Sequence, residues 1–344
     1  MTTATVTPYQ SLLSLRQTEA AIDFVKTTFE KELAQSLHLV KVSAPLFVLD
    51  GTGINDDLNG IERPVAFPIK GMQEQKAVVV HSLAKWKRMR LQQLDIPAGE
   101  GLYTNMHALR PDEDFTPIHS IYVDQWDWEK VMEPQQRTLP FLKATVKKIY
   151  AALKVTEQKV YELYPQIKPV LPQEITFLHA EDLLQQYPTL TPKQRETEAA
   201  RTYGAVFIIG IGGALSHGQP HDGRAADYDD WSTPTSDGYK GLNGDIILWN
   251  PVLETAFEIS SMGIRVDKEA LLQQLAERDC LERRHLLFHQ QLLSGGLPQS
   301  IGGGIGQSRT CMFLLRKAHI GEVQASIWPE EVVKDCAERG IPLL

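Results

Sequence analysis

The 344-residue sequence predicts an α+β fold in which helices flank a central, largely antiparallel sheet. Short runs of β-branched or aromatic residues, bounded by Gly, Pro, Asp or Asn, indicate the strands. These runs do not alternate regularly with helices, and two of them are separated by only a few residues, which disfavours a doubly wound parallel sheet. The predicted strands cover residues 37–47, 76–81, 119–124, 175–179, 204–211, 244–249 and 255–260.

The first predicted element is an amphipathic helix over residues 12–37. Its apolar residues recur at spacings of three and four, which places them on one helix face; they are Ile22, Val25, Phe29, Leu33 and Leu37. The strand predicted over 37–47 passes through Pro45. Because proline has no N–H to donate, we expect this strand at an edge or end of the sheet.

Later helices are predicted over 141–164, 192–202, 267–293 and 307–317. Thr191 and Asp267 are expected N-caps, since each precedes a helical pattern and has a side-chain oxygen that can accept from the first turn. The stretch from about residue 131 to 200 is therefore predicted to be a mainly helical insertion. With no internal repeat or Pro/Ser-rich linker, residues 1–344 are expected to form a single domain.

Composition excludes several classes of function. Lys and Arg total 35 against 43 Asp and Glu, a net charge of −8, which disfavours a nucleic-acid partner. The longest apolar run, 205–215, is far shorter than the ~20 residues that span a bilayer, so no membrane association is expected. Residues 1–10 lack the pattern of a secretory signal. The three cysteines are far apart without a C-x-x-C motif, which suits a reducing cytoplasm.

The most unusual segment is the glycine run within residues 300–309. Residues 302–306 contain four glycines, which permit close approach of the backbone to a flat group or to phosphate oxygens. The run is neither a P-loop nor a dinucleotide fingerprint, because the required Lys and final Gly are missing. A strand that crosses close to another element is the alternative interpretation. Arg309, just inside the next helix, favours a nucleotide.

Polar residues also gather on strand faces. Strand alternation places Gln125 and Asp127 on one side, and it places Glu258 and Ser260 together. Asp245 stands at the start of another strand. Solvent exposure can explain any one strand, but three such strands beside a glycine run predict a polar binding face.

The charged residues of this face suit a nucleoside triphosphate and its metal. Asp245 and Glu258 form a carboxylate pair of the kind that binds Mg²⁺, which keeps water and substrate phosphates in its shell. Arg110, Arg265 and Arg309 can bind phosphate oxygens with paired hydrogen bonds.

Three further patterns are ambiguous. Residues 81–90 carry four cations and a Trp, and a solvated helix face with one functional lysine is favoured over a nucleic-acid patch. Residues 227–231 contain three acids, which form either an acidic turn or a cation or amine site. His217, His221 and Asp222 suggest zinc, but no further ligands follow at a usable spacing.

Two segments resemble signatures of class II aminoacyl-tRNA synthetases. Residues 109–113 resemble the second signature, an Arg-x-x-Glu-like stretch on an antiparallel strand, and residues 301–309 resemble the third. The long helix, the strand and Pro45 within residues 1–45 resemble the first signature, which forms the dimer interface. The chain as a whole resembles the aspartate–ammonia ligases, on residues 81–88, 99–104, 108–114, 122–128, 227–234, 241–245 and 260–265.

The resemblance implies a class II synthetase-like catalytic domain, a homodimer, and a reaction in two steps. L-Aspartate and ATP would first give β-aspartyl-adenylate and pyrophosphate, and ammonia would then give L-asparagine and AMP. ATP and Mg²⁺ are the implied cofactors. The chemistry is sensible because adenylation converts a carboxylate oxygen, a poor leaving group, into AMP, provided the protein aligns the reactants and neutralises their charge.

The resemblance also implies roles for residues that bind the nucleotide. Arg110 would hold the α-phosphate and the β-carboxylate, and Arg309 would contact ATP by stacking on adenine or holding the γ-phosphate. Asp245 and Glu258 would hold Mg²⁺. The remaining residues of the implied ATP and AMP site are Glu113, Ser261, Arg265, Gly304 and Gly306.

A second implied set binds aspartate together with Arg110; its members are Asp56, Ser82, Lys87, Gln125 and Asp127. Lys87 suits a carboxylate of aspartate, and Asp56 or Asp127 suits its α-ammonium. Asp229 is expected to hold or deprotonate the ammonium nucleophile, because NH4⁺ has no lone pair and a carboxylate in a water-poor pocket is a reasonable base. The catalytic residues are thus expected to be Arg110, Gln125, Asp229 and Arg309.

Two alternatives share parts of this pattern. A class II aspartyl- or asparaginyl-tRNA synthetase would need an anticodon-binding module, and no spare segment of ~100 residues is expected here. A catalytically inactive paralogue that only binds an amino acid is disfavoured by the presence of both arginines and both metal-type acids. Free ammonia is expected as the nitrogen source, because no Cys follows Met1 and no room is expected for an amidotransferase domain.

Overall fold

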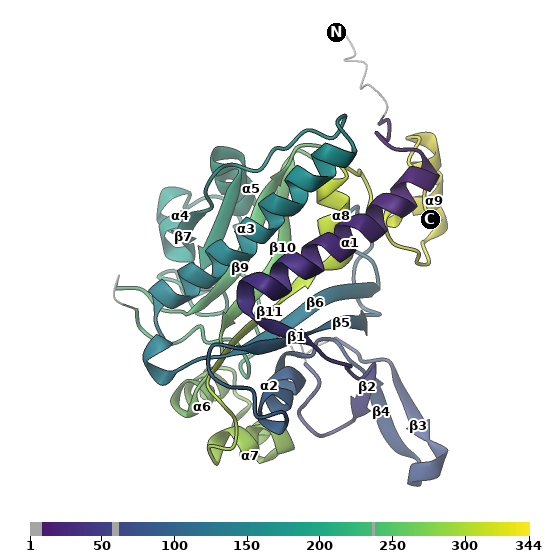
Figure 1. The fold of residues 1–344 in the computed structure, drawn as a ribbon. Helices are drawn as coiled ribbons and strands as arrows, with labels where there is room; N and C mark the ends of the chain where they lie inside the picture. Colours follow the sequence, from purple (N-terminus) through teal and green to yellow (C-terminus); the bar gives the residue numbers. More distant parts are fainter. Residues whose placement is uncertain (1–8, 57–61, 236–237) are drawn as a thin grey trace.

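The computed structural model describes residues 9–56, 62–235 and 238–344. Eight of the described strands form one sheet, in the order β1-β5-β6-β11-β10-β9-β8-β7 (Figure 1). The central pairs are antiparallel, while the outer pairs β1–β5 and β7–β8 are parallel. The strand bounds are β1 Leu39–Lys41, β5 Gly101–Leu109, β6 Tyr122–Val131, β7 Thr176–His179, β8 Ala205–Ile209, β9 Asn243–Asn250, β10 Thr255–Ile264 and β11 Ser300–Gly306. The expected largely antiparallel sheet is confirmed.

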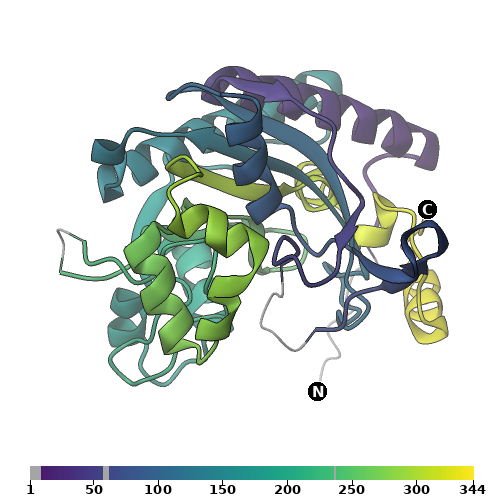
Figure 2. The same cartoon turned by 90° about the horizontal axis from the view of Figure 1, so that it is seen from below.

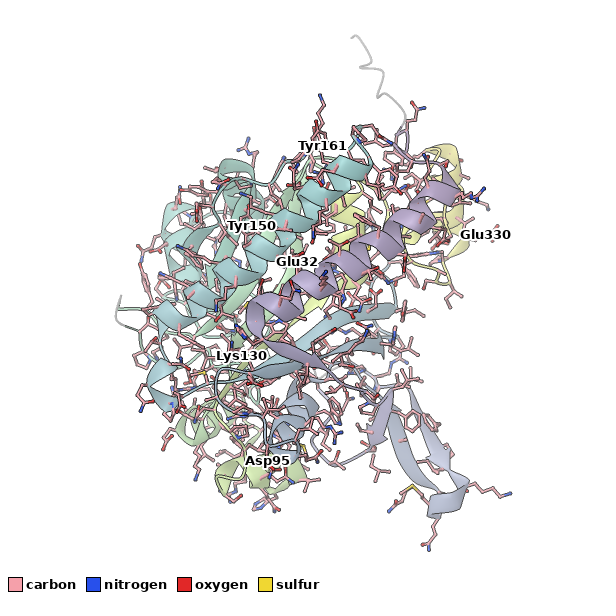
Figure 3. The ribbon with its side chains drawn as sticks, viewed as in Figure 1. Glu32, Asp95, Lys130, Tyr150, Tyr161 and Glu330 are labelled. Carbon is pink, nitrogen blue, oxygen red and sulfur yellow. The ribbon has the colours of Figure 1, made fainter. Side chains whose placement is uncertain are left out.

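Two long helices cover one face of this sheet (Figures 1 and 2). Helix α1 (Leu15–Leu37) begins at the Ser14–Gln17 capping box and buries a stripe that includes Val25 and Phe29. Helix α3 (Leu139–Leu163) lies beside it (Figure 3), and an ion pair of 2.7 Å between Lys159 and Glu32 joins the two. Both helices pack on a hydrophobic core that the inward side chains of the sheet complete.

The opposite face carries shorter helices with a space between them. Helices α4 (Ala180–Gln186) and α5 (Pro192–Tyr203) pack over β7 to β10. Helix α2 (Ala84–Gln93) packs on β6 and β11, and α6 (Lys268–Glu277) and α7 (Leu287–Leu293) lie at the same end of the sheet (Figure 2). Helices α8 (Gln307–Leu314) and α9 (Glu330–Glu338) complete the fold.

The prediction of one continuous strand over 37–47 is wrong, because the chain passes from one sheet to another within this segment. Only Leu39–Lys41 pairs with β5, and β2 (Phe47–Leu49) joins a second sheet in the order β2-β4-β3, with β3 at Ala66–Ile69 and β4 at Gln75–Val79. Pro45 lies between the two pieces, where it cannot donate to a ladder.

The helix expected over 267–293 is also interrupted. Asp267 caps α6 as predicted, with its carboxylate accepting from the Ala270 N–H at 2.8 Å. The helix then ends, Asp279 adopts a left-handed conformation with φ of 51°, and a 3₁₀ turn (Leu281–His285) precedes α7. Thr191 caps α5 as predicted. None of the described helices combines the length and apolarity needed to cross a membrane.

Some elements carried too little sequence signal to predict. Strand β5, the hairpin strand β3 and the helices α4 and α9 were not expected, and the strand expected at 119 begins at Tyr122 and continues to Val131. The helix within 81–90 is present, but its face is not solvated. Lys85, Lys87 and Arg88 are buried, each against acidic or carbonyl oxygens of neighbouring segments.

Candidate active site

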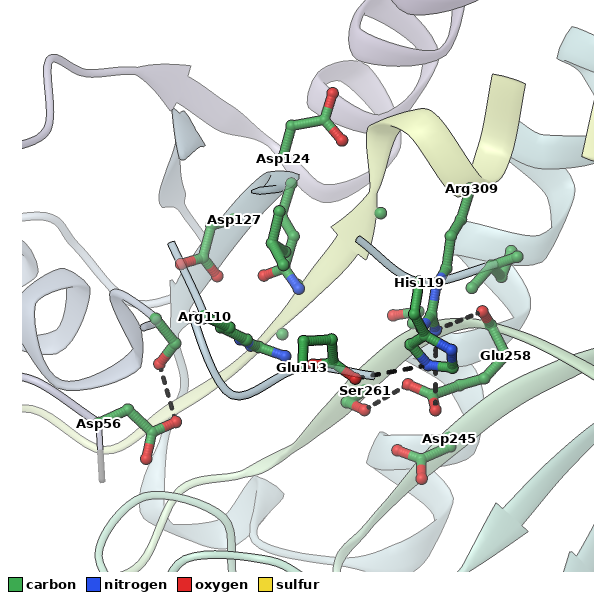
Figure 4. A pocket seen from close by; sticks show the side chains of 18 of the residues that line it. Asp56, Arg110, Glu113, His119, Asp124, Asp127, Asp245, Glu258, Ser261 and Arg309 are labelled. Atoms are coloured by element: carbon green, nitrogen blue, oxygen red, sulfur yellow. Dashed lines mark hydrogen bonds and ion pairs between the residues drawn. The ribbon is translucent and has the colours of Figure 1, made fainter. Parts of the chain in front are cut away.

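A cavity of about 420 Å³ lies on the sheet face opposite α1 and α3 (Figure 4). Every site residue expected from the sequence lines it, except Lys87. These lining residues are Asp56, Ser82, Arg110, Glu113, Gln125, Asp127, Asp229, Asp245, Glu258, Ser261, Arg265, Gly304, Gly306 and Arg309. Residues that are more than 250 positions apart in the sequence therefore meet at one site.

The glycine run forms the floor of the cavity as strand β11. It pairs with β6, so that Gly304 faces Asp127 and Gly306 faces Gln125 in the register. A Cβ at Gly304 would lie 2.1 Å from Gln125 Oε1, and one at Gly302 would lie 2.0 Å from Glu129 Oε2. Glycine is needed here because side chains of β6 lie directly across β11.

Lys87 is buried behind Asp127 and does not line the cavity. Its side chain is therefore not placed for the expected direct contact with a substrate carboxylate. Its ammonium contacts the Asp127 carboxylate and donates to the carbonyls of Trp128, at 2.9 Å, and Gly303, at 3.2 Å. Burial lowers the pKa of Lys87, although Asp127 and Glu129 act in the opposite direction. Lys87 thus fixes Asp127 and the floor strand.

The two carboxylates expected to bind metal face the same cavity. Ser261 Oγ donates to Glu258 Oε1 at 3.0 Å, while Arg224 contacts Asp245. Burial raises the pKa of Asp245 to about 6, and the neighbouring Glu258 adds to this rise. Burial would also raise the pKa of Glu258, but the Arg309 and Lys193 cations lower it to about 2.

A β-bulge explains which serine joins Glu258. Between Glu258 and Ser260 the register of β10 against β9 shifts by one residue. Ser261 therefore pairs with Asp245 and lies on the face of Glu258. The alternation that placed Glu258 with Ser260 is wrong for this reason, because strict alternation holds only in a regular strand.

The donor set suits a hard cation that also binds substrate. Among residues 9–56, 62–235 and 238–344, no group of three or more His, Cys, Asp or Glu side chains could hold a metal. Two carboxylates facing one cavity fit Mg²⁺, which is commonly held by one or two carboxylates plus substrate phosphates. The residues that suggested zinc have partners in the protein, since His221 bonds Glu196 at 3.2 Å and Asp222 bonds Lys193 at 2.8 Å.

The acidic segment 227–231 is tied to the protein's own cations. Asp227 is buried between Lys85, at 2.9 Å, and His289, at 3.0 Å. Asp229 contacts Arg265, and one of its oxygens is 3.5 Å from Arg224 Nε. Asp229 is thus a buried carboxylate held between two guanidinium groups at the cavity.

Besides Arg224, three arginines line the cavity. Arg110 donates to the His81 carbonyl at 3.1 Å, and its Nε is buried without a partner among the described residues. Arg309 donates to the Glu258 carbonyl at 3.0 Å. Arg265 is held by Glu129, with Nη2 at 2.8 Å from the carboxylate. Arg110 therefore keeps a guanidinium N–H that has no acceptor among the described residues.

At the other end of the cavity, Asp56 and Ser82 form a small polar pair. Ser82 Oγ donates to Asp56 Oδ2 at 3.0 Å, a contact drawn as a dashed line at Asp56 in Figure 4. The Asp56 carbonyl is 3.1 Å from His81 Nδ1. Asp56 and Asp127 lie on one side of Arg110, while Glu258, Asp245 and Arg309 lie on the other. Arg110 thus lies between the two residue sets expected for aspartate and for ATP.

Arg224 and His119 are among the cavity residues that sequence reasoning missed. His119 stands between Glu113, at 4.0 Å, and Thr116, at 2.7 Å, and burial together with Arg309 lowers its pKa to about 4, so it is neutral near pH 7. Arg224 is followed by the acidic segment 227–231, which was the available signal. That segment alone does not show that Arg224 faces the same cavity, since tertiary packing places it there.

Comparison with known proteins identifies the relationship. A model of the aspartate–ammonia ligase family matches residues 16–340. The aspartate–ammonia ligase of Parabacteroides distasonis is 59% identical, over 98% of this chain and 97% of the relative. That of Bacteroides thetaiotaomicron is 57% identical, and that of Clostridium perfringens strain 13 is 56% identical, over the same shares.

Solved structures give the fold independently. An asparaginyl-tRNA synthetase from Pyrococcus horikoshii, complexed with asparaginyl-adenylate, has a TM-score of 0.66 at 16% identity, with 91% of this chain and 70% of that chain covered. An asparaginyl-tRNA synthetase from Entamoeba histolytica has a TM-score of 0.62 at 15% identity, covering 90% and 67%. The domain thus has the class II aminoacyl-tRNA synthetase fold, and the chain belongs to the aspartate–ammonia ligase family.

Proposed function

We propose that this protein joins ammonia to the β-carboxylate of L-aspartate, consuming ATP and releasing L-asparagine, AMP and pyrophosphate. The observation that carries the proposal is the position of Arg110, between Asp56 and Asp127 on one side and Glu258, Asp245 and Arg309 on the other. A cation at that point neutralises the carboxylate that attacks and the α-phosphate that receives it.

In the first step, aspartate binds with its α-ammonium at Asp56 and Asp127. Gln125 supplies an amide beside them, and Lys87 keeps Asp127 in place. A β-carboxylate oxygen then attacks the α-phosphorus, and the bond from that phosphorus to the pyrophosphate oxygen breaks. Alignment of the two reactants by the cavity supplies much of the rate.

The nucleotide would occupy the other half of the cavity. The residues expected to bind it supply oxygens, cations and bare backbone to the cavity; they are Arg309, Glu113, Ser261, Arg265, Gly304 and Gly306. When bound, Mg²⁺ would neutralise phosphate charge, and Asp245 and Glu258 are the residues that would hold it. We infer that activity requires a divalent cation; removal of Mg²⁺ with EDTA should abolish it, and readdition should restore it.

In the second step, ammonia attacks the activated carbonyl carbon, and the bond to the AMP oxygen breaks. Asp229 would attract ammonium through its carboxylate, which lines the cavity. This side chain is buried and is fixed beside Arg265. Loss of a proton from NH4⁺ must precede attack, and a carboxylate of the cavity is the available acceptor.

The assay that tests this proposal contains purified protein, ATP, aspartate and NH4Cl, with no RNA. It should yield asparagine and AMP in equal amounts. A requirement for tRNA would favour the synthetase alternative, and pyrophosphate exchange without any amidation would contradict the ligase reaction. Absence of aspartate-dependent exchange would support an inactive binding paralogue.

We further propose a homodimer formed through the N-terminal segment 1–45, of which residues 1–8 lie outside the described residues. Apolar side chains are exposed on this segment, with 53% of Leu15 and 48% of Val40 accessible. Exposed apolar groups on one segment are typical of an interface. Sedimentation equilibrium should give twice the chain mass.

A further inference from the structure

Helix α8 carries Arg309 in its first turn but has no cap of its own. Its N-cap is Gly306, and no side chain of the N-cap accepts a hydrogen bond there. A Cβ at Gly306 would lie 3.2 Å from the Cβ of Arg309, so a longer capping residue would crowd the arginine. The first N–H groups of a helix need acceptors from elsewhere when the N-cap supplies none.

Asp124 of β6 supplies that acceptor from a distant part of the chain. Its Oδ1 accepts from the Ser308 N–H at 2.9 Å, although 184 residues separate the two. The Asp124 side chain is 3% exposed. The carboxylate therefore works as a remote cap on the turn that bears Arg309, and its negative charge suits a helix N-terminus.

The other oxygen of Asp124 is bound by helix α1. Lys26 Nζ donates to Asp124 Oδ2 at 2.9 Å, and the Lys26 side chain is 33% exposed. Both oxygens of Asp124 are therefore engaged by protein groups, one by each helix. Ser308, the residue that Asp124 caps, also accepts from Gln324 Nε2 through its hydroxyl at 3.0 Å.

We propose that Asp124 is a positioning residue for ATP binding, which acts through Arg309 and is itself held by Lys26. The carboxylate fixes the first turn of α8, and that turn directs the Arg309 side chain into the cavity. Helix α1, on the far face of the sheet, is thereby connected to the nucleotide half of the site. This inference rests on the proposed contact of Arg309 with ATP.

The test compares KM for ATP with KM for aspartate in steady-state assays of the full chain. Asp124→Ala should raise KM for ATP about tenfold, which corresponds to ~1.4 kcal/mol, and should leave KM for aspartate unchanged. Asp124→Asn retains an oxygen for the Ser308 N–H, so its effect should be smaller. Lys26→Met, which removes only the support of Asp124, should also raise KM for ATP.

Lys159→Met is the matched control, because it removes another lysine ion pair to α1, the one with Glu32, whose two residues do not line the cavity. It should leave both KM values unchanged. A thermal melt of each variant shows whether a change in KM comes from a loss of folding. If Asp124→Ala does not fold, the KM for ATP of Lys26→Met and of Asp124→Asn tests the inference instead.

A double-mutant cycle with Arg309→Ala separates positioning from direct contact. If Asp124 acts through Arg309, Asp124→Ala should add less than about twofold to KM for ATP in the Arg309→Ala background, since the two effects are not independent. A full additional effect there, or an unchanged KM for ATP in both Asp124 variants and in Lys26→Met, would overturn the inference. An inactive wild-type protein would instead overturn the proposed function.

Discussion

At the scale of single residues, buried carboxylates at the cavity are paired with cations. Asp127 is met by Lys87, Asp229 by Arg265, and Asp245 by Arg224. Breaking one partner of such a pair leaves an uncompensated buried charge, which is costly. Arg110 is the exception, since its contact in the protein is a carbonyl oxygen. Its charge is therefore available to a ligand.

Arg110→Ala should lower kcat strongly and the melting temperature little. Loss of a charge contact made in the transition state typically costs ~3–4 kcal/mol, or about 10²–10³ in kcat. Steady-state kinetics and a thermal melt measure the two effects. Arg201→Ala, at an exposed arginine paired with Glu198, is the control and should change neither. Near-normal turnover in folded Arg110→Ala would remove Arg110 from the mechanism.

Asp245 makes stability depend on pH. Its pKa is about 6 in the folded protein against an ordinary 3.8, so the folded state retains a proton that the unfolded chain releases between these values. Stability from this group is present at low pH and is lost as pH rises through about 6.

Asp245→Asn should therefore gain stability relative to wild type as pH rises from 4.5 to 7.5, by on the order of 1 kcal/mol. Urea unfolding at several pH values gives the difference in free energy of unfolding. A difference between the two proteins that does not vary with pH would contradict the raised pKa of Asp245.

At the scale of elements, the site depends on two departures from regular strands. The bulge of β10 brings Ser261 beside Glu258, and the bare backbone of β11 leaves room for Gln125 and Glu129. Each departure involves only a few residues, and each allows side chains to lie at the cavity that a regular strand would not place there.

Gly304→Ala should displace Gln125, because the new methyl group would lie 2.1 Å from its amide oxygen. We expect KM for aspartate to rise about tenfold, with a smaller change for ATP, since the loss of one well-placed side-chain contact is worth ~1.4 kcal/mol. Gly71→Ala is a suitable control, as nothing lies within 4 Å of its added Cβ. Unchanged kinetics in Gly304→Ala would show that Gln125 does not bind the substrate.

The elements show why part of the structure was predictable from sequence. Periodic helices such as α1 and α3 were found because their buried stripes repeat along the chain, and the caps Thr191 and Asp267 were found by residue type. The break in the helix after Glu277 was missed because its cause, a left-handed Asp279, leaves no period to detect. The bulge was missed because alternation assumes a regular ladder.

The candidate site was predictable to a different degree. Residue types and the resemblance identified residues that the structure brings to one cavity, while their roles stay predictions. Lys87 was misplaced, since a sequence cannot tell a lysine that lines a cavity from one buried behind Asp127. His119 and Arg224 were missed because each is placed by tertiary packing alone.

At the scale of the whole molecule, the face with α1 and β1 is where we expect the second copy. Val40→Glu places a charge on the edge strand β1, so we expect monomers, by size-exclusion chromatography with light scattering. Leu272→Glu, on α6 at another part of the surface, should leave the mass unchanged. A wild-type monomer, or an unaffected Val40→Glu dimer, would contradict an interface through residues 1–45.

The proposed reaction also depends on the whole molecule, because residues from distant parts of the chain must bring the β-carboxylate of aspartate to the α-phosphorus of ATP. The most direct measurement uses L-aspartate labelled with ¹⁸O in its β-carboxylate, with ATP and NH4Cl, and mass spectrometry of the products. Attack of that carboxylate on the α-phosphorus predicts one ¹⁸O atom in AMP and one in asparagine. Unlabelled AMP, or ADP with ¹⁸O in inorganic phosphate, would contradict activation as β-aspartyl-adenylate.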